Sequence, residues 1–214
     1  MKGKSLLLTL VIIIIAISCV AQVTGTFTDL RDGKIYSTIE LGEQTWLSEN
    51  LAYKAGTGCW AYADNDSNVA KYGYLYNWET SKNVCPNGWH LPSEAEFRTL
   101  AQFFGGVFTY KIRSSHGSES KAGTKMKSTT GWEGFGNGTD EKGFNALPAG
   151  FRLGKGVYKK MGSSSSWWCS TEEHGYNADE FTAYSLDLIS SSGFIAITCL
   201  NQKDFGLSVR CMKN

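Results

Sequence analysis

The order of apolar and polar residues predicts strands near both ends of the chain and helices in its middle. Residues 35–41 alternate with the period of a half-buried strand, so that Ile35, Ile39 and Leu41 share one face. Further short strands are predicted towards the C-terminus at residues 167–171, 181–188, 194–200 and 207–212. Strands at both ends around a helical middle predict an α+β fold whose terminal strands meet in one antiparallel sheet.

Two helices are predicted between these strands. The first covers residues 74–83, with Leu75 and Trp78 on one face. The second begins at a capping box, in which Ser93 and Glu96 satisfy backbone N–H groups at the helix start. It continues with apolar residues at helical spacing and stops at a glycine pair: Phe97, Leu100, Ala101 and Phe104, then Gly105 and Gly106.

The N-terminus has the pattern of an export signal. Lys2 and Lys4 precede an apolar run over residues 6–17, which is shorter than the roughly 20 residues of a membrane-spanning helix. Cleavage after Ala21 would give a signal peptide of residues 1–21. Alternatively, residues 16–19 resemble a bacterial lipobox, in which the signal ends at residue 18 and Cys19 is lipidated. We therefore expect either a secreted protein or a lipoprotein of the outer membrane or cell surface, attached to a membrane only through its lipid.

Charge limits the classes of binding partner, and cysteine content indicates the compartment. The chain has 21 basic and 20 acidic residues, so it offers no strong field to nucleic acid or anionic lipid. Six cysteines suit an oxidising compartment, and one of them, Cys19, lies in the predicted signal. The other five are an odd number, which leaves at least one thiol outside any intrachain disulfide.

Candidate catalytic and metal sites are weak. Cys169 is a candidate nucleophile, with His174 as its base. The sequence favours a different interpretation, in which Cys169 is structural and His174 lies in a nearby loop. Asp64 and Asp66 begin a calcium-like loop, but Val69 and Leu75 stand where calcium loops have glycine and glutamate. We expect no catalytic residue, no cofactor and no resident metal, with calcium as the only cation worth testing.

Several ordered motifs are shared with a known family. They include Cys-Pro-Asn-Gly-Trp-His-Leu-Pro at the start of the second helix, and they occupy residues 72–78, 85–97, 125–128, 131–132, 139–140, 143–150, 167–171 and 208–211. Over residues 27–213 the set resembles the Fibrobacter succinogenes major paralogous domain. That family is exported, is often lipid-anchored and is widespread in Bacteroidota and Fibrobacterota. The resemblance implies a C-type lectin-like fold, with two helices packed on short antiparallel sheets and long loops, and a distant similarity to formylglycine-generating, sulfatase-modifying proteins.

The resemblance also suggests how the cysteines pair. In lectin-like folds a cysteine near a helix joins one in the last strand, which implies a disulfide between Cys85 and Cys211. Independently of the resemblance, Cys169 and Cys199 both fall in the predicted C-terminal strands, so they could pair with each other, or one of them could join Cys59, and the sequence does not choose between these pairings. Cys169 departs from the family pattern, which has serine at that position.

Function is expected in loops, because lectin-like folds carry recognition there. Residues 111–145 are rich in Gly, Ser and Thr and predict long loops, and residues 60–68 lie in another. We expect a module that binds a glycan or a protein at the cell surface. The alternatives are a structural surface protein without a small ligand and, least favoured, an oxidase-like enzyme. The candidate ligand residues are Trp60, Asp64, Asp66, Trp132, Asn137 and Asp140.

Overall fold

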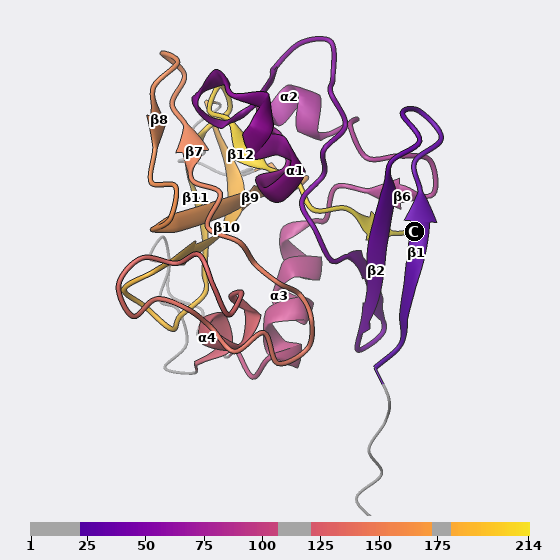
Figure 1. Cartoon of the computed structure of the whole chain (residues 1–214), viewed down its shortest axis with the longest axis vertical. Coiled ribbons are helices and arrows are strands. Elements are labelled where there is room, and N and C mark those ends of the chain that lie inside the picture. Colours follow the sequence, from indigo (N-terminus) through magenta and orange to yellow (C-terminus); the bar gives the residue numbers. More distant parts are fainter. Residues whose placement is uncertain (1–21, 107–120, 173–180) are drawn as a thin grey trace, which may run out of the picture.

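A computed structural model describes residues 22–106, 121–172 and 181–214 (Figure 1). The predicted signal with Cys19, and also His174, lie outside the described residues. Within them the protein is a mixed α and β structure of three sheets and a few short helices. None of the helices in these ranges has the length and apolar character needed to cross a membrane.

The first sheet joins both ends of the described chain. Its last strand, β13, runs antiparallel to its two neighbours, and Met212 lies opposite Trp46 on one side and His90 on the other. The prediction that the terminal strands share a sheet is therefore confirmed. The strand order is β1 (Thr24–Thr28), β2 (Ile35–Leu41), β3 (Gln44–Leu47), β13 (Met212–Lys213) and β6 (Trp89–His90).

The second sheet carries most of the predicted C-terminal strands. β12 runs parallel to β9, and the other neighbouring strands are antiparallel. The order is β11 (Ala196–Gln202), β10 (Thr182–Ile189), β9 (Ser164–Trp168), β12 (Leu207–Ser208), β5 (Leu75–Tyr76) and β4 (Cys59–Trp60). A separate hairpin pairs β7 (Phe151–Arg152) with β8 (Tyr158–Lys159).

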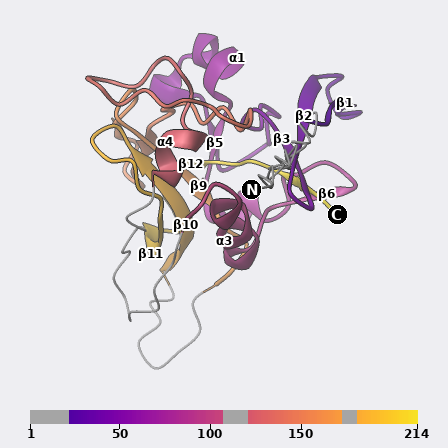
Figure 2. The same ribbon diagram turned by 90° about the horizontal axis from the view of Figure 1, so that it is seen from below.

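Helix α3 (Glu94–Phe103) confirms the second predicted helix and lies between the two large sheets (Figures 1 and 2). Ser93 and Glu96 form the predicted capping box. Phe97 and Leu100 are fully buried in one cluster with residues of both sheets, among them Leu41 of β2 and Leu186 of β10. Burial of this face, more than intrinsic helix propensity, fixes the helix in place.

The prediction of a first helix over residues 74–83 is wrong over most of that range. Residues 75–76 form β5, where Tyr76 lies opposite both Cys59 and Leu207, and only α2 (Trp78–Ser81) is helical. Asn77 caps that short helix by accepting a hydrogen bond from the backbone N–H of Thr80, 2.9 Å away. Tertiary pairing with two strands therefore overrides the local pattern.

Two further local predictions differ from the structure. In β2, Ile35 is 62% exposed, whereas Tyr36 is fully buried in a hydrophobic cluster, and its hydroxyl accepts a hydrogen bond from the N–H of Ala52 at 3.0 Å. The stretch predicted as loops contains a helix, α4 (Ala122–Met126), which packs against α3. The other short helices are α1 (Val69–Tyr72) and the 3₁₀ turns η1 (Tyr62–Asp64) and η2 (Asp66–Asn68).

Cys85 and Cys211 form a disulfide, as the resemblance implied. The pairing of Cys169 with Cys199 is wrong. Cys169 follows β9 and donates its N–H to Tyr184 of β10, whereas Cys199 lies in β11 beyond β10. Because β10 lies between β9 and β11, the backbones at Cys169 and Cys199 are about 10 Å apart, which is too far for a disulfide. Cys59 is also outside any disulfide.

Candidate functional site

An arginine stacked on a tryptophan marks the main candidate site. The guanidinium carbon of Arg152, in β7, lies 4.0 Å from the centre of the Trp60 ring, in β4. The same carbon lies 5.9 Å from the Tyr158 ring in β8. These strands come from distant parts of the sequence, so the contact is made only in the folded protein. Both Trp60 and Arg152 are partly exposed.

Two residues of the η1 turn extend this cluster. The Tyr62 and Tyr158 rings are 5.2 Å apart between centroids, and the Tyr62 hydroxyl accepts a hydrogen bond from the N–H of Met161. The Tyr158 hydroxyl donates to the carboxylate of Asp64. We call the set Trp60, Tyr62, Asp64, Arg152 and Tyr158 the Trp60–Arg152 surface.

Glycine allows these side chains to approach one another. Gly206 pairs with Arg152 through two backbone hydrogen bonds, of 2.7 and 2.9 Å. A methyl group at Gly206 would lie 3.1 Å from the Arg152 Cβ and 3.2 Å from a Trp60 ring carbon. Gly150 has a φ of 68°, and a Cβ there would lie 2.7 Å from the Tyr62 ring. Both positions therefore favour residues without a side chain.

The charge of Arg152 is not neutralised within the described part of the chain. No carboxylate there lies within 4.0 Å of its guanidinium, and its Nε is buried without a hydrogen-bond partner. Burial raises the pKa of Tyr158, and the hydrogen bond to Asp64 raises it further. Tyr158 therefore stays protonated at neutral pH and donates to Asp64.

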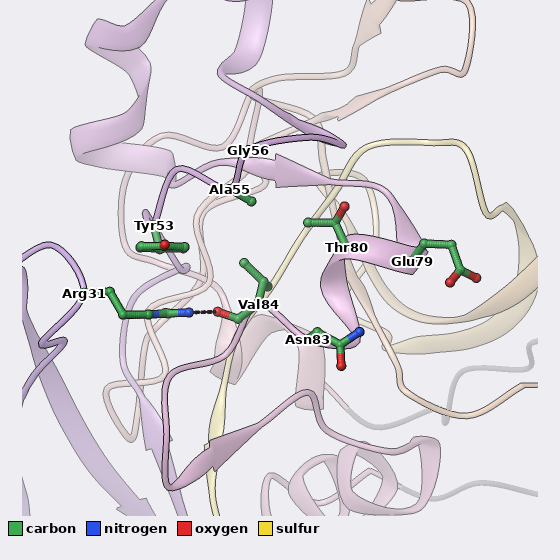
Figure 3. A pocket seen from close by; sticks show the side chains of 8 residues that line it. All are labelled: Arg31, Tyr53, Ala55, Gly56, Glu79, Thr80, Asn83 and Val84. Atoms are coloured by element: carbon green, nitrogen blue, oxygen red, sulfur yellow. Dashed lines mark hydrogen bonds between the residues drawn. The ribbon is translucent and has the colours of Figure 1, made fainter.

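A separate candidate site, a hollow lined by Arg31 and Tyr53, has different electrostatics (Figure 3). It is an open depression of about 350 Å³, and Figure 3 shows the Arg31 guanidinium lying flat against the Tyr53 ring on one side, with Thr80 and Asn83 on the other. Arg31 donates to both carboxylate oxygens of Asp29, at 2.9 and 2.6 Å, and to the carbonyl of Val84 at 2.8 Å. This arginine is fully paired and serves as a wall of the depression.

Comparison with protein families identifies the chain. Residues 39–213 match the Fibrobacter succinogenes major domain. The chain belongs to this family. No curated protein and no solved structure gives a significant match to the chain.

The sequence-predicted ligand residues of this family member separate into two groups. Trp60 and Asp64 come together on the Trp60–Arg152 surface. Asp66 lies nearby in η2, where its carboxylate is 3.7 Å from the ammonium of Lys54. Trp132 belongs to the core, so its assignment to a ligand loop is wrong: it is 4% exposed, and its indole N–H donates to the carbonyl of Ala146 at 3.0 Å.

Asn137 and Asp140 stabilise the loop that follows α4. The Asn137 side-chain oxygen accepts from the N–H of Trp132 at 3.0 Å, and Asp140 accepts from the N–H of Asn145 at 2.7 Å. Burial raises the pKa of Asp140. Within the described residues, no three His, Cys, Asp or Glu side chains are grouped as a metal ion would require. The loop oxygens named here therefore act as turn caps.

Cys169 lies in an environment unsuited to a nucleophile. Its side chain is completely buried in the same cluster as Phe97 and Leu186, and burial raises the pKa of its thiol well above the usual value. A reactive cysteine needs the opposite, a lowered pKa and access to substrate. His174, the base considered for it, lies outside the described residues.

Sequence reasoning missed Tyr62, Arg152 and Tyr158. The signal that was available is the segment 151–160, Phe-Arg-Leu-Gly-Lys-Gly-Val-Tyr-Lys-Lys, in which two glycines separate short segments carrying arginine and tyrosine. That pattern predicts a hairpin with a basic and aromatic surface. It does not indicate that Trp60 and Asp64 lie against the hairpin, because the contact is long-range.

Proposed function

We propose that this chain is an exported binding module that recognises a glycan through the Trp60–Arg152 surface. The observation that carries the proposal is the partly exposed pairing of Trp60 with Arg152, whose charge has no partner among the described residues. Sugar rings present flat C–H faces that pack on aromatic rings and hydroxyl groups that bond to charged and amphipathic side chains. Tyr158 and Asp64 supply such groups next to the rings.

The residue types support a binding role. Trp, Tyr and Arg dominate the energetics of recognition surfaces, because each combines a large, rigid apolar area with hydrogen-bonding capacity. Here they are held by β4 and the β7–β8 hairpin, which pre-organises them and lowers the entropic cost of binding. The depression of Figure 3 is less suitable for a charged ligand, since Asp29 already neutralises Arg31.

The proposal includes a lectin-like fold and an extracytoplasmic location. Support for the first is the arrangement of terminal strands in one sheet beside a long helix, with a disulfide from the helix region to the C-terminal strand region. Support for the second is that disulfide, which persists in oxidising compartments, and the signal predicted for residues 1–21. Lipidation at Cys19 would tether the module, and cleavage after Ala21 would release it.

The test is a glycan array probed with the protein purified after export, followed by affinity electrophoresis on the polysaccharides that bind. We expect a reproducible subset of glycans to bind, and the variant Trp60→Ala to lose at least about ten-fold in affinity, as loss of a central aromatic contact costs ~1.4 kcal/mol or more. Trp60→Phe, which keeps an aromatic ring, should retain more of the binding than Trp60→Ala.

Calcium is tested in the same assay. Binding is expected to be equal with calcium and with a chelator, because the loop oxygens of Asn137 and Asp140 cap backbone N–H groups. If the array is blank in both conditions, the glycan proposal fails and a structural surface protein becomes the better account.

A further inference from the structure

The glycan-binding surface is flanked by an unbalanced positive charge. Residues 151–160, which form the β7–β8 hairpin, contain Arg152, Lys155, Lys159 and Lys160 and no acidic residue. The three lysines are exposed. None of them lies within 4.0 Å of a carboxylate in the described ranges, unlike the lysines that form ion pairs elsewhere, such as Lys34 and Lys203. The hairpin is thus a local concentration of charge on a nearly neutral chain.

The nearby acids offset only part of this charge. Asp64 accepts the hydroxyl of Tyr158 and keeps its negative charge, whereas Asp66 lies 3.7 Å from Lys54, which compensates it. Asp204 lies beside Gly154 at the hairpin turn, where its carboxylate leaves no room for a Cβ. Against these, the hairpin offers four cations, and one of them stacks directly on Trp60.

We propose that the ligand of this surface is an acidic polysaccharide, one whose sugar rings carry carboxylate or sulfate groups. This inference rests on the glycan-binding function proposed above and names its substrate class. Arg152 has the planar set of donors that matches a carboxylate or sulfate. Its Nη1 donates to the carbonyl of Leu153 at 3.4 Å, and no carboxylate of the described residues lies within 4.0 Å, so an anion beside this partly exposed side chain would supply the charge partner that these residues do not. The partly exposed Trp60 and Tyr158 lie beside the guanidinium and offer the apolar parts of their rings that Arg152 and Tyr62 leave uncovered, and the lysines extend the charge along a chain-like ligand.

The contrast with Arg31 strengthens the assignment. Both arginines stack on an aromatic ring, at 3.8 Å for Arg31 on Tyr53 and 4.0 Å for Arg152 on Trp60. Arg31 is held by the fully buried carboxylate of Asp29. A third stacked arginine, Arg210, also lacks a carboxylate partner, but it is fully buried and donates to Asn50 and to the carbonyl of Phe144. Arg152 has the same stacking but no carboxylate partner among the described residues. An anionic group of a ligand can take the place that Asp29 has beside Arg31.

The experiment measures affinity by isothermal titration calorimetry for four polymers: polygalacturonate, dextran sulfate, neutral dextran and polyglutamate. We expect the two acidic polysaccharides to bind at least about ten-fold more tightly than dextran and polyglutamate, and their binding to weaken as salt rises. The ratio between polygalacturonate and dextran sulfate tells whether carboxylate or sulfate is preferred.

Charge variants test the surface itself. Arg152→Gln should weaken polygalacturonate binding about ten-fold or more, and Arg152→Lys should recover only part of it, because lysine keeps the charge but not the planar donors. The double variant Lys155→Gln with Lys159→Gln changes only exposed residues, so it tests the proposal even if Arg152 variants unfold. Lys213→Gln, an exposed lysine of the first sheet, is the matched control and should change affinity less than two-fold, or about 0.4 kcal/mol.

The outcomes separate the two proposals. Equal binding of dextran and polygalacturonate would overturn the acidic-ligand inference and leave glycan binding through Trp60 intact. Equal binding of polyglutamate and polygalacturonate would also overturn it, since charge alone would explain the affinity. Failure of every polysaccharide to bind would reject the proposed function and the inference with it.

Discussion

The guanidinium of Arg152 stacks on the ring of Trp60 at 4.0 Å, although the two residues lie in different sheets. Arg31 stacks on Tyr53 and is paired with the carboxylate of Asp29. Arg152 is partly exposed and has no carboxylate within 4.0 Å among the described residues. The proposed binding depends on this unpaired cation beside Trp60, and the scaffold that holds the two residues in place can be tested separately.

Two tryptophans that were both candidates for ligand contact should behave in opposite ways. Trp132→Ala should lower the free energy of unfolding by about 3–5 kcal/mol, because Trp132 is buried and its indole donates to Ala146. Trp60→Ala should lower it by less than about half that amount, since the ring is partly exposed. Urea denaturation followed by circular dichroism measures both. A larger loss for Trp60→Ala than for Trp132→Ala would contradict the assignment of Trp132 to the core.

Asn50 is expected to be critical for stability. Its side-chain oxygen accepts hydrogen bonds from the Trp167 indole and from the Arg210 guanidinium, each at 2.8 Å, and both donors are fully buried. Asn50→Ala leaves these donors without an acceptor and should cost about 3 kcal/mol or more. Asn50→Asp keeps the acceptor but loses the Nδ2 donor to the Tyr72 carbonyl, 2.9 Å away, so its stability should lie between those of the native protein and Asn50→Ala. In thermal denaturation, Asn50→Ala should have the lowest melting temperature and Asn50→Asp a higher one. Equal melting temperatures for the two variants would argue against the role of the Asn50 oxygen as acceptor for Trp167 and Arg210.

The disulfide should contribute strongly to stability. It closes a loop with a sequence separation of 126 residues, which in the chain-entropy model is worth about 5 kcal/mol. Cys85→Ser with Cys211→Ser should therefore unfold at a much lower urea concentration than the native protein. Cys59→Ser, which removes a thiol outside any disulfide, should leave the midpoint nearly unchanged. Equal midpoints for the double variant and for Cys59→Ser would show that Cys85 and Cys211 are not joined.

The capping box gives a pH-dependent contribution. Burial raises the pKa of Glu96, but hydrogen bonds from Ser93 and the interaction with His90 outweigh it, so the pKa is lower than the usual 4.5. A carboxyl with a lowered pKa in the folded state stabilises the protein above its unfolded pKa and loses this contribution as the pH falls through the folded pKa. The difference in unfolding free energy between native protein and Glu96→Gln should therefore shrink between about pH 6 and pH 3.

Glu43→Gln is the control for that measurement, because Glu43 is exposed and lies in a turn outside the capping box. Its difference from the native protein should stay small across the same pH range. A difference for Glu96→Gln that is constant or grows on acidification would contradict the assigned role of the ionised carboxylate.

Some features of the fold were predictable from sequence and others were not. The meeting of the terminal strands was predicted correctly, whereas the first helix was lost to strand pairing of residues 75–76. Ser93 and Glu96 lie three residues apart and report directly on the helix start, so the capping box was found. Trp132 was misjudged because its glycine neighbours suggested an exposed loop, whereas its burial depends on Ala146 and the packing of α4. Resemblance to the family supplied the pairing of Cys85 with Cys211, which spacing does not determine.

In the candidate site, the chemistry of single residues was predictable, but the contacts between distant residues were not. Trp60 and Asp64 were recognised as loop residues with suitable chemistry. Arg152 and Tyr158 were not, because their relevance arises only when Gly206 and Gly150 let the hairpin pack against η1 and β4. Sequence indicates which side chains can bind a ligand, and the fold decides which of them meet.

The most direct test of the central claim is the ¹H–¹⁵N spectrum of the seven tryptophan indole groups during titration with oligogalacturonate. Five of these indoles donate to protein acceptors, in Trp46, Trp78, Trp132, Trp167 and Trp168. We predict that the Trp60 signal, assigned with Trp60→Phe, shifts saturably while these five stay in place. A saturable shift confined to other tryptophans, or no shift at all, would contradict binding at the Trp60–Arg152 surface.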